Sequence, residues 1–175
     1  MIIRLVGLLL IGTGLGGWLR SYTQAGREAA RRATCVSNIK CLALSLVMYA
    51  QDHEGRLPVL ARGQRDTWAI AAERYVHSAD VLWCPGDGRF RQYARARRPG
   101  AEAESDGRDL IRLRRQRIGV ASSYVMNPQL SGVRIEDMKD PVNTVMLEES
   151  PGFHKGYRVV AYAAGYAKAL KLKGE

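Results

Sequence analysis

The chain begins with an almost uninterrupted apolar stretch. Between Ile2 and Leu19 the only charged residue is Arg4. A helix over these residues would extend about 27 Å, close to the roughly 30 Å thickness of the hydrocarbon core of a bilayer. The stretch therefore predicts a transmembrane anchor over residues 1–20. The side chains that we expect to form this anchor are Ile2, Ile3, Leu5, Val6, Leu8, Leu9, Leu10, Ile11, Leu15, Trp18 and Leu19.

Two other interpretations of this stretch compete with the anchor. A cleaved secretory signal would also have a basic start and an apolar middle, with Thr23-Gln24-Ala25 as the cleavage site. A dinucleotide-binding loop would account for the Gly-x-Gly-x-x-Gly match at residues 12–17. That loop needs an acidic residue about 20 positions later, and Glu28 comes too early. We therefore favour the anchor.

The next segment alternates apolar and polar residues with a helical period. We predict one helix, or two in line, from about Ile2 to His53, with residues 21–54 as its amphipathic half. Gly55 and Pro58 are expected to end it. The apolar positions recur every three or four residues at Ala29, Ala33, Val36, Ile39, Ala43, Leu46 and Ala50.

Beyond residue 55 the elements become short and turn residues multiply. A second helix is predicted over residues 67–76, and strands over residues 122–126, 144–148 and 157–162. Residues 166–173 fit either a last strand or a basic helical turn. The predicted fold class is α+β: a long N-terminal helix packed on a small antiparallel sheet, with residues 55–175 as a globular head.

The charge of the chain points to acidic partners. Lys and Arg number 27 against 17 Asp and Glu, which gives a net charge of +10 and suits nucleic acid, anionic lipid or acidic polymers. Ten arginines lie in residues 89–117, which we interpret either as a solvated loop or as a polyanion contact. The candidate contact residues are Arg95, Arg97, Arg98, Arg112, Arg114, Arg115 and Arg117.

Three cysteines are too few for a disulfide framework, and none lies at zinc-binding spacing from another cysteine or a histidine. Cys35 and Cys41 lie on different faces of a helix, so they cannot pair with each other. In an oxidising compartment Cys84 would bridge one of them; otherwise all three are small buried apolar residues. We expect no metal and no cofactor.

His154 follows Pro151-Gly152-Phe153, which is typical of a turn. We therefore interpret His154 as a surface or loop-bracing residue without a second metal ligand at useful spacing. No sequence signature supports a cysteine nucleophile paired with His77, and the chain is expected not to be an enzyme.

Several short stretches, in a fixed order over residues 25–170, carry a resemblance to a known family. They are residues 27–32, Cys35, residues 37–40, residues 48–58, Trp68, Tyr75, Cys84-Pro85, residues 123–127, Asp140-Pro141 and Thr144-Val145. Together they resemble the pilin-like proteins of bacteria, in particular the type II secretion pseudopilin-type branch that carries a C-terminal His and, after nine intervening residues, Asp-Gly.

The resemblance implies an N-terminal helix that anchors the subunit and can assemble helix against helix with other pilin-like subunits. It also implies a head built on a four-stranded antiparallel sheet outside the cytoplasmic membrane. Members of this kind are structural subunits of secretion or pilus machinery, or envelope proteins of unknown task, without a small-molecule substrate.

Two features depart from the family pattern. The prepilin leader and the membrane glutamate that follows it are missing, which argues against processing as a prepilin and against insertion into a filament. In the C-terminal motif, His154 keeps its spacing, but Ala164-Gly165 replaces Asp-Gly. We therefore expect a divergent member and carry over no cation site from this motif.

Two arguments about topology conflict. Arg20, Arg27, Arg31 and Arg32 outnumber Arg4, and the positive-inside rule would then place the head in the cytoplasm. The resemblance places it outside, and we follow the resemblance. The prediction is a non-catalytic, single-pass inner-membrane pilin-like subunit with a periplasmic head. The alternative is a nucleic-acid- or envelope-polymer-binding module that uses the Arg-rich loop.

Overall fold

A computed structural model describes residues 2–60, 67–89 and 122–172, with side chains described from residue 21 onward. Helix α1 (Ile2–Asp52) is followed by α2 (Thr67–Glu73) and the 3₁₀ turn η1 (Ala79–Leu82). The C-terminal part contains β1 (Tyr124–Met126), β2 (Val145–Glu149), β3 (Tyr157–Tyr162) and β4 (Ala167–Lys171), with the 3₁₀ turns η3 (Pro128–Leu130) and η4 (Ile135–Asp137) between β1 and β2. The predicted α+β class is confirmed.

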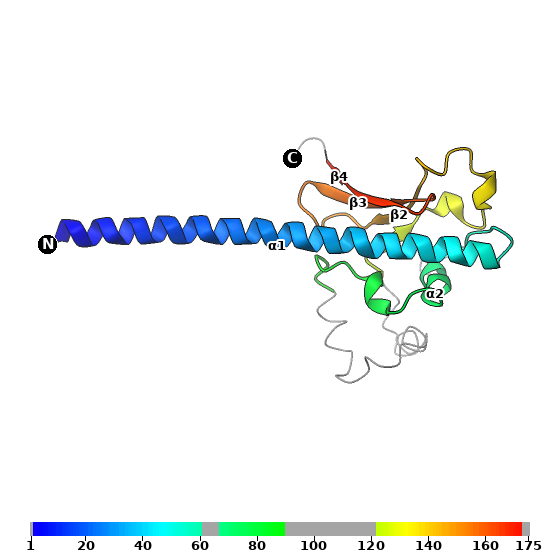
Figure 1. The fold of residues 1–175 in the computed structure, drawn as a ribbon, viewed down its shortest axis with the longest axis horizontal. Coiled ribbons are helices and arrows are strands. Elements are labelled where there is room, and N and C mark those ends of the chain that lie inside the picture. Colours follow the sequence, from blue (N-terminus) through cyan, green and yellow to red (C-terminus); the bar gives the residue numbers. More distant parts are fainter. Residues whose placement is uncertain (1, 61–66, 90–121, 173–175) are drawn as a thin grey trace, which may run out of the picture.

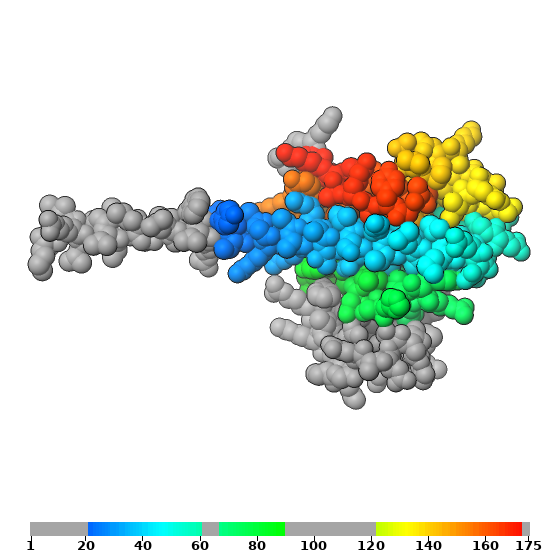
Figure 2. All heavy atoms as spheres, viewed as in Figure 1, coloured from blue at the N-terminus to red at the C-terminus, as the bar shows by residue number. Residues whose placement is uncertain are grey.

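Helix α1 is the longest element and runs unbroken for 51 residues. Its N-terminal part extends beyond the rest of the fold, while its C-terminal part lies between the sheet on one side and α2 on the other (Figure 1). Figure 2 shows the same C-terminal part as a band embedded along the head. One helix therefore belongs to the head and also projects from it.

The buried stripe of α1 starts later than the sequence pattern suggested. Ala29 and Ala33 are exposed, and the first fully buried residue of α1 among the described side chains is Cys35. The fully or almost fully buried apolar positions are Cys35, Ile39, Leu42, Ala43, Leu46 and Ala50.

The predicted end of the helix agrees with the structure. Gly55 adopts a φ of 77°, and its N–H donates to the Ala50 carbonyl at 2.8 Å. This left-handed C-terminal cap suits glycine because a Cβ is unfavourable there.

The four strands form an antiparallel meander in the order β1-β2-β3-β4. Residues 166–173, for which strand and helical turn were both open, contain strand β4. In β3, Tyr157 pairs with Lys171 and Ala161 pairs with Ala167. Three predicted strands occur within one or two residues of their expected bounds, whereas α2 ends at Glu73 instead of residue 76.

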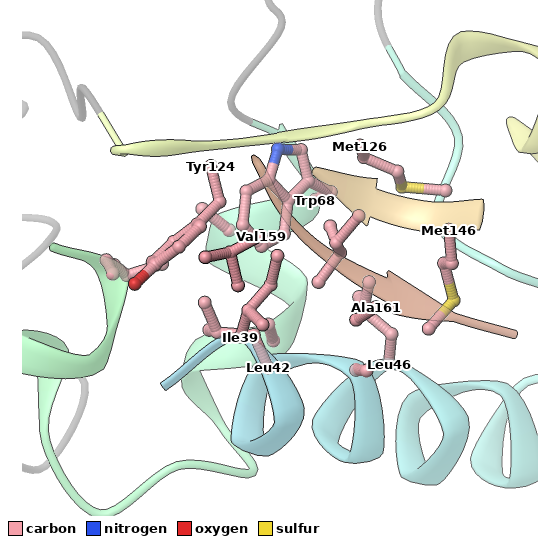
Figure 3. Close-up of a cluster of buried hydrophobic side chains, with 14 of the residues drawn as sticks. Ile39, Leu42, Leu46, Trp68, Tyr124, Met126, Met146, Val159 and Ala161 are labelled. Carbon is pink, nitrogen blue, oxygen red and sulfur yellow. The ribbon is translucent and has the colours of Figure 1, made fainter. Parts of the chain in front are cut away.

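The core lies between α1, α2 and the sheet. Figure 3 shows Ile39, Leu42 and Leu46 of α1 facing Val159 and Ala161 of β3, with Trp68 of α2 beside them. Large apolar side chains buried together in this way supply most of the stability of a small domain.

Candidate functional site

A disulfide joins α1 to the turn that follows η1. Cys35 and Cys84 are both fully buried, their Cα atoms lie 5.3 Å apart, and they are bonded through sulfur. Beside them, the side-chain amide of Asn38 donates to the Trp83 carbonyl at 3.0 Å. The sequence left open whether Cys84 pairs with Cys35 or with Cys41. In the structure Cys84 pairs with Cys35, and Cys41 is a free, exposed cysteine.

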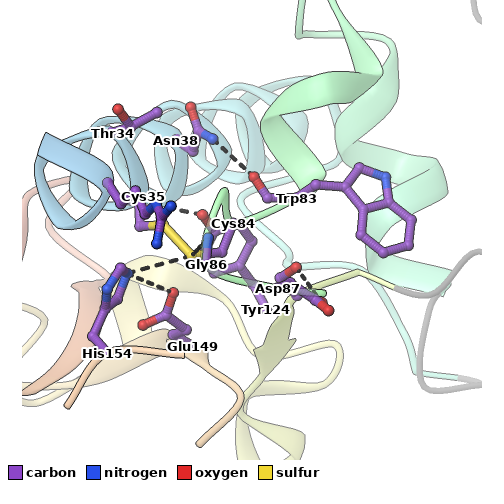
Figure 4. Close-up of a disulfide and its surroundings, with 12 residues drawn as sticks. Thr34, Cys35, Asn38, Trp83, Cys84, Gly86, Asp87, Tyr124, Glu149 and His154 are labelled. Carbon is purple, nitrogen blue, oxygen red and sulfur yellow. Dashed lines mark hydrogen bonds and ion pairs between the residues drawn. A yellow bond between two sulfur atoms is a disulfide. The ribbon is translucent and has the colours of Figure 1, made fainter. Parts of the chain in front are cut away.

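His154 lies against this disulfide and is buried, so its expected surface position is wrong. Its Nδ1 is 2.6 Å from Oε1 of Glu28 on α1, and its Nε2 is 3.3 Å from the Cys84 sulfur. Nε2 also lies 3.5 Å from Oε1 of Glu149 (Figure 4). The histidine does brace its loop, because it links the loop between β2 and β3 to α1.

Glu149 is the last residue of β2 and is only 3% exposed. Its Oε1 accepts no hydrogen bond within the described part of the chain. Burial raises the pKa of Glu149 to about 7, and the negative charges of Glu28 and Asp87 act in the same direction. A buried carboxyl without a hydrogen-bond donor is unfavourable in its charged form.

Asp87 is the second buried acid near the disulfide, and its surroundings have the opposite effect. Burial alone would raise its pKa, but hydrogen bonds from Arg89 and Ser123 hold the pKa of Asp87 below its ordinary value. The Arg89 guanidinium donates at 2.7 Å and the Ser123 hydroxyl at 2.8 Å. The charged form of Asp87 is therefore satisfied, whereas that of Glu149 is not.

Gly86 allows the turn after Cys84 to approach the loop that carries His154. A Cβ at this position would lie 2.9 Å from the Phe153 carbonyl oxygen and 3.4 Å from the Cys84 sulfur. Because the nearest atom belongs to the backbone, a side chain here would push the two loops apart.

A cleft of about 590 Å³ opens beside Glu149 and His154. Tyr157, Arg158 and Glu148 also line it, and Arg158 forms an ion pair with Glu148. Glu149 and His154 belong to the lining of this cleft, but their side chains are only 3% and 0% exposed, so the cluster itself is closed to solvent.

Ala164 and Gly165, the described residues of the predicted C-terminal motif besides His154, do not join this cluster. Ala164 and Gly165 follow the end of β3, whereas His154 precedes its start. The six residues of β3 separate the two positions by about 20 Å, at 3.3 Å per residue. The two halves of the C-terminal motif therefore do not converge on one site.

Two groups of predicted residues cannot be placed in this way. The seven arginines proposed to contact polyanions lie outside the described residues, as do the side chains of the predicted anchor. Arg89, at the edge of the Arg-rich stretch, pairs with Asp87.

Two acidic residues of the cluster were missed by the sequence analysis, although weak signals existed. Glu28 precedes Cys35 by seven residues, which places the two on one face of a helix. Glu149 follows Leu147 by two residues, which places the two on one face of a strand. Neither spacing indicates that this face of the helix and this face of the strand lie close together in the folded head.

Residues 24–83 of the chain match the family described as "Protein of unknown function (DUF1559)". No curated protein matches the chain, and no solved structure matches it either. The matched residues include Glu28 and Cys35 and end just before Cys84.

Proposed function

We propose that the chain is a single-pass, membrane-anchored, pilin-like structural subunit whose head lies outside the cytoplasmic membrane. The observation that carries this proposal is α1, a single helix that extends beyond the head and also forms its core (Figure 1). An element of this kind couples an anchor rigidly to a head.

The composition of α1 supports a membrane role. In the part of α1 whose side chains are described, Ser21–Asp52 is long and apolar enough to span a membrane, but this stretch also packs into the head. Within the head, the buried part of α1 packs against protein, so the anchor is assigned to the apolar residues 2–19.

The buried disulfide supports a head outside the cytoplasm. Disulfides persist in oxidising compartments such as the periplasm and are rare in the cytosol. The Cys35–Cys84 bond closes a separation of 49 residues between α1 and the turn after η1. We give this observation more weight than the arginines after residue 19, because several of those arginines belong to the folded helix.

The family match is compatible with this role, since the matched family is associated with pilin-like and type II secretion-like proteins. The stretch that matches contains the end of the helix and its connection to α2.

A structural role also fits the chemistry of the buried cluster. The Cys84 sulfur near His154 is bonded to Cys35 and is therefore not a thiolate nucleophile. The role as a subunit further fits the exposed apolar side chains of Leu44 and Met48 on α1, next to the helix surface around Cys41.

The free Cys41 allows a direct test of topology. Intact bacterial cells with a permeabilised outer membrane would be treated with a membrane-impermeant maleimide, and the full-length protein would then be purified from the membrane fraction. We expect Cys41 to be labelled, and the matched Cys41→Ser variant to remain unlabelled. Labelling that appears only after the inner membrane is opened would place the head in the cytoplasm and refute the proposal.

Anchoring is tested by the same preparation. N-terminal sequencing of the membrane-extracted protein should find residues 1–20 retained. Recovery of a soluble protein that begins near Gly26 would instead identify a cleaved signal.

Assembly through the anchor would be tested by chemical crosslinking of copies in the membrane. Gly12 and Gly16 form a Gly-x-x-x-Gly pair, which permits close approach of helices in lipid. Gly16→Leu should abolish crosslinked species, whereas Gly7→Leu, outside the pair, should retain them. Equal crosslinking in both variants would argue against assembly through this pair.

A further inference from the structure

The disulfide, His154 and Glu149 place four metal-ligating groups in one buried cluster. One ligand atom from each of Cys35, Cys84, Glu149 and His154 lies within 4.8 Å of all the others. In a tetrahedral zinc site with bonds of about 2.0–2.3 Å, the ligand atoms lie roughly 3.3–3.8 Å apart. Small side-chain movements would therefore bring these four atoms around one ion.

The histidine already has the orientation that a metal ligand needs. Its Nδ1 faces Oε1 of Glu28 at 2.6 Å, which leaves Nε2 directed at the Cys84 sulfur and at Glu149. Metal-bound histidines commonly donate their second ring N–H to a carboxylate in this way, which fixes the tautomer and the ring.

Glu149 supplies a second ligand group beside the histidine that lacks a partner. Its carboxyl is buried, and Oε1 has no hydrogen-bond partner in the described part of the chain while it faces His154 Nε2 (Figure 4). Native proteins rarely leave a buried polar atom unpaired. A cation bound there after reduction of the disulfide would give Oε1 a partner.

We propose that these four residues form a redox-gated zinc site, closed while Cys35 and Cys84 are bonded and formed when they are reduced. Two thiolates, one imidazole and one carboxylate constitute a complete tetrahedral set for Zn²⁺, with Glu28 as the outer partner of the histidine. The proposal goes beyond the structural role of the chain and does not depend on its anchor.

The chemistry balances with a dithiol reductant, such as a thiol–disulfide oxidoreductase. The reductant provides two electrons and two protons, the Cys35–Cys84 bond breaks to give two thiols, and the reductant becomes a disulfide. Zn²⁺ then replaces the two thiol protons, which pass to solvent. Glu149 and His154 are also among the residues that line the neighbouring cleft.

The test uses the full-length protein in detergent micelles, freed of metal with a chelator that is then removed. Co²⁺ serves as a spectroscopic probe, and Zn²⁺ affinity is measured by competition with a chromophoric chelator. After reduction we expect about one equivalent of Co²⁺ to bind, with the thiolate charge-transfer and d–d bands of a tetrahedral site. The oxidised protein should show none of these bands.

Variants separate this site from adventitious binding. His154→Ala and Glu149→Gln should each weaken Zn²⁺ binding by the reduced protein by at least about tenfold, and Glu28→Ala by about 10–100-fold. Cys41→Ser and Glu148→Gln are matched controls, since they remove an exposed thiol and the neighbouring carboxyl on β2. Both controls should bind as the wild type does.

Three results would overturn the proposal. The first is the lack of a thiolate band in the reduced wild type, and the second is unchanged affinity in His154→Ala. The third concerns folding. If reduction lowers the helical circular dichroism signal, Zn²⁺ should restore that signal. A reduced protein that neither regains the signal nor binds Zn²⁺ would exclude the site. The circular dichroism of each oxidised variant shows that the substitution itself leaves the fold intact.

Discussion

Oε1 of Glu28 lies 2.6 Å from Nδ1 of His154, although the two residues are 126 positions apart in the chain. Glu28 stands on α1 one heptad before Cys35, and His154 stands in the loop between β2 and β3. Their contact links the loop to the helix at the point where α1 leaves the head. Together with the Cys35–Cys84 disulfide it fixes that end of the head to α1.

This contact predicts that Glu28→Ala destabilises the head. The buried imidazole would lose the partner of its Nδ1, and an unsatisfied buried polar group costs about 1–3 kcal/mol. Urea unfolding of the full-length oxidised protein, followed by circular dichroism, measures the loss. Glu136→Gln, which removes an exposed partner of Arg134, should change stability by less than about 1 kcal/mol. Similar losses in both variants would contradict the structural role of the pair.

The disulfide predicts a specific thiol count and a large effect of reduction. Denatured protein should contain one reactive thiol, from Cys41, and three after reduction. Closing a loop of this length stabilises the folded state by about 4 kcal/mol in the chain-entropy model. Urea unfolding with and without reductant, in the presence of a chelator, measures this difference. The Cys41→Ser protein should lose the same amount on reduction.

The raised pKa of Glu149 predicts that the stability of the oxidised protein falls with increasing pH. In the unfolded chain Glu149 titrates near 4.5, and in the folded head near 7, so between these values the folded state holds the extra proton. Stability is therefore highest below about pH 4.5 for this group and falls by about 3 kcal/mol as pH rises through 7. The groups that face Glu149 are Glu28 of α1, Asp87 and His154.

Comparison with Glu149→Gln isolates this contribution, because the amide does not titrate. The difference in unfolding free energy between wild type and variant, measured with a chelator present, should grow in favour of the variant from pH 5 to pH 8. Glu148→Gln should show no such trend. A difference that is independent of pH would mean that the Glu149 carboxyl keeps its ordinary pKa.

The backbone conformation of Gly165, in the C-terminal motif, predicts that the stability of the head is sensitive to a side chain at this position. It turns the chain between β3 and β4 with a φ of 84°, and a Cβ there would lie 3.0 Å from Leu44 Cδ2 on α1. Gly165→Ala should destabilise the head by about 1–2 kcal/mol through its left-handed backbone, with the contact to Leu44 adding to the effect. Thermal unfolding provides the measurement.

Gly152→Ala is the matched control for Gly165. Gly152 has a φ of 100°, but its added Cβ would meet nothing within 4 Å. Gly152→Ala has the same kind of backbone penalty from a positive φ but no contact like that with Leu44. It should therefore destabilise the head less than Gly165→Ala. An equal loss of stability in the two variants would show that the Leu44 side chain moves aside without a measurable loss of free energy.

Much of the fold could be predicted because it depends on local patterns. The apolar spacing of Ile39, Ala43 and Leu46 identifies the helix face that the head covers, and Gly55 marks its end. The strands were located by apolar runs between turn residues. The choice between strand and helical turn for residues 166–173 was decided by pairing with β3, which local sequence does not determine.

The cluster could not be predicted because its members belong to segments that meet only in the folded head. Glu28, Cys84, Glu149 and His154 come from α1, the turn after η1, the end of β2 and the following loop. His154 was therefore interpreted as a surface residue from its turn-like neighbours. Its burial follows from the packing of two loops at Gly86, which no spacing in the sequence reports.

The position of the Cys35–Cys84 bond has a mechanical consequence. Among the described side chains of α1, Cys35 is the first that is fully buried from the projecting side, and the contacts of Glu28 with His154 and of Arg32 with Tyr157 precede it. Tension along the helix would load these two contacts first and then the covalent crosslink, which shields the contacts of α1 with the sheet beyond Cys35. When the projecting part of α1 is pulled, the head would thus hold the helix until the sulfur–sulfur bond is cleaved.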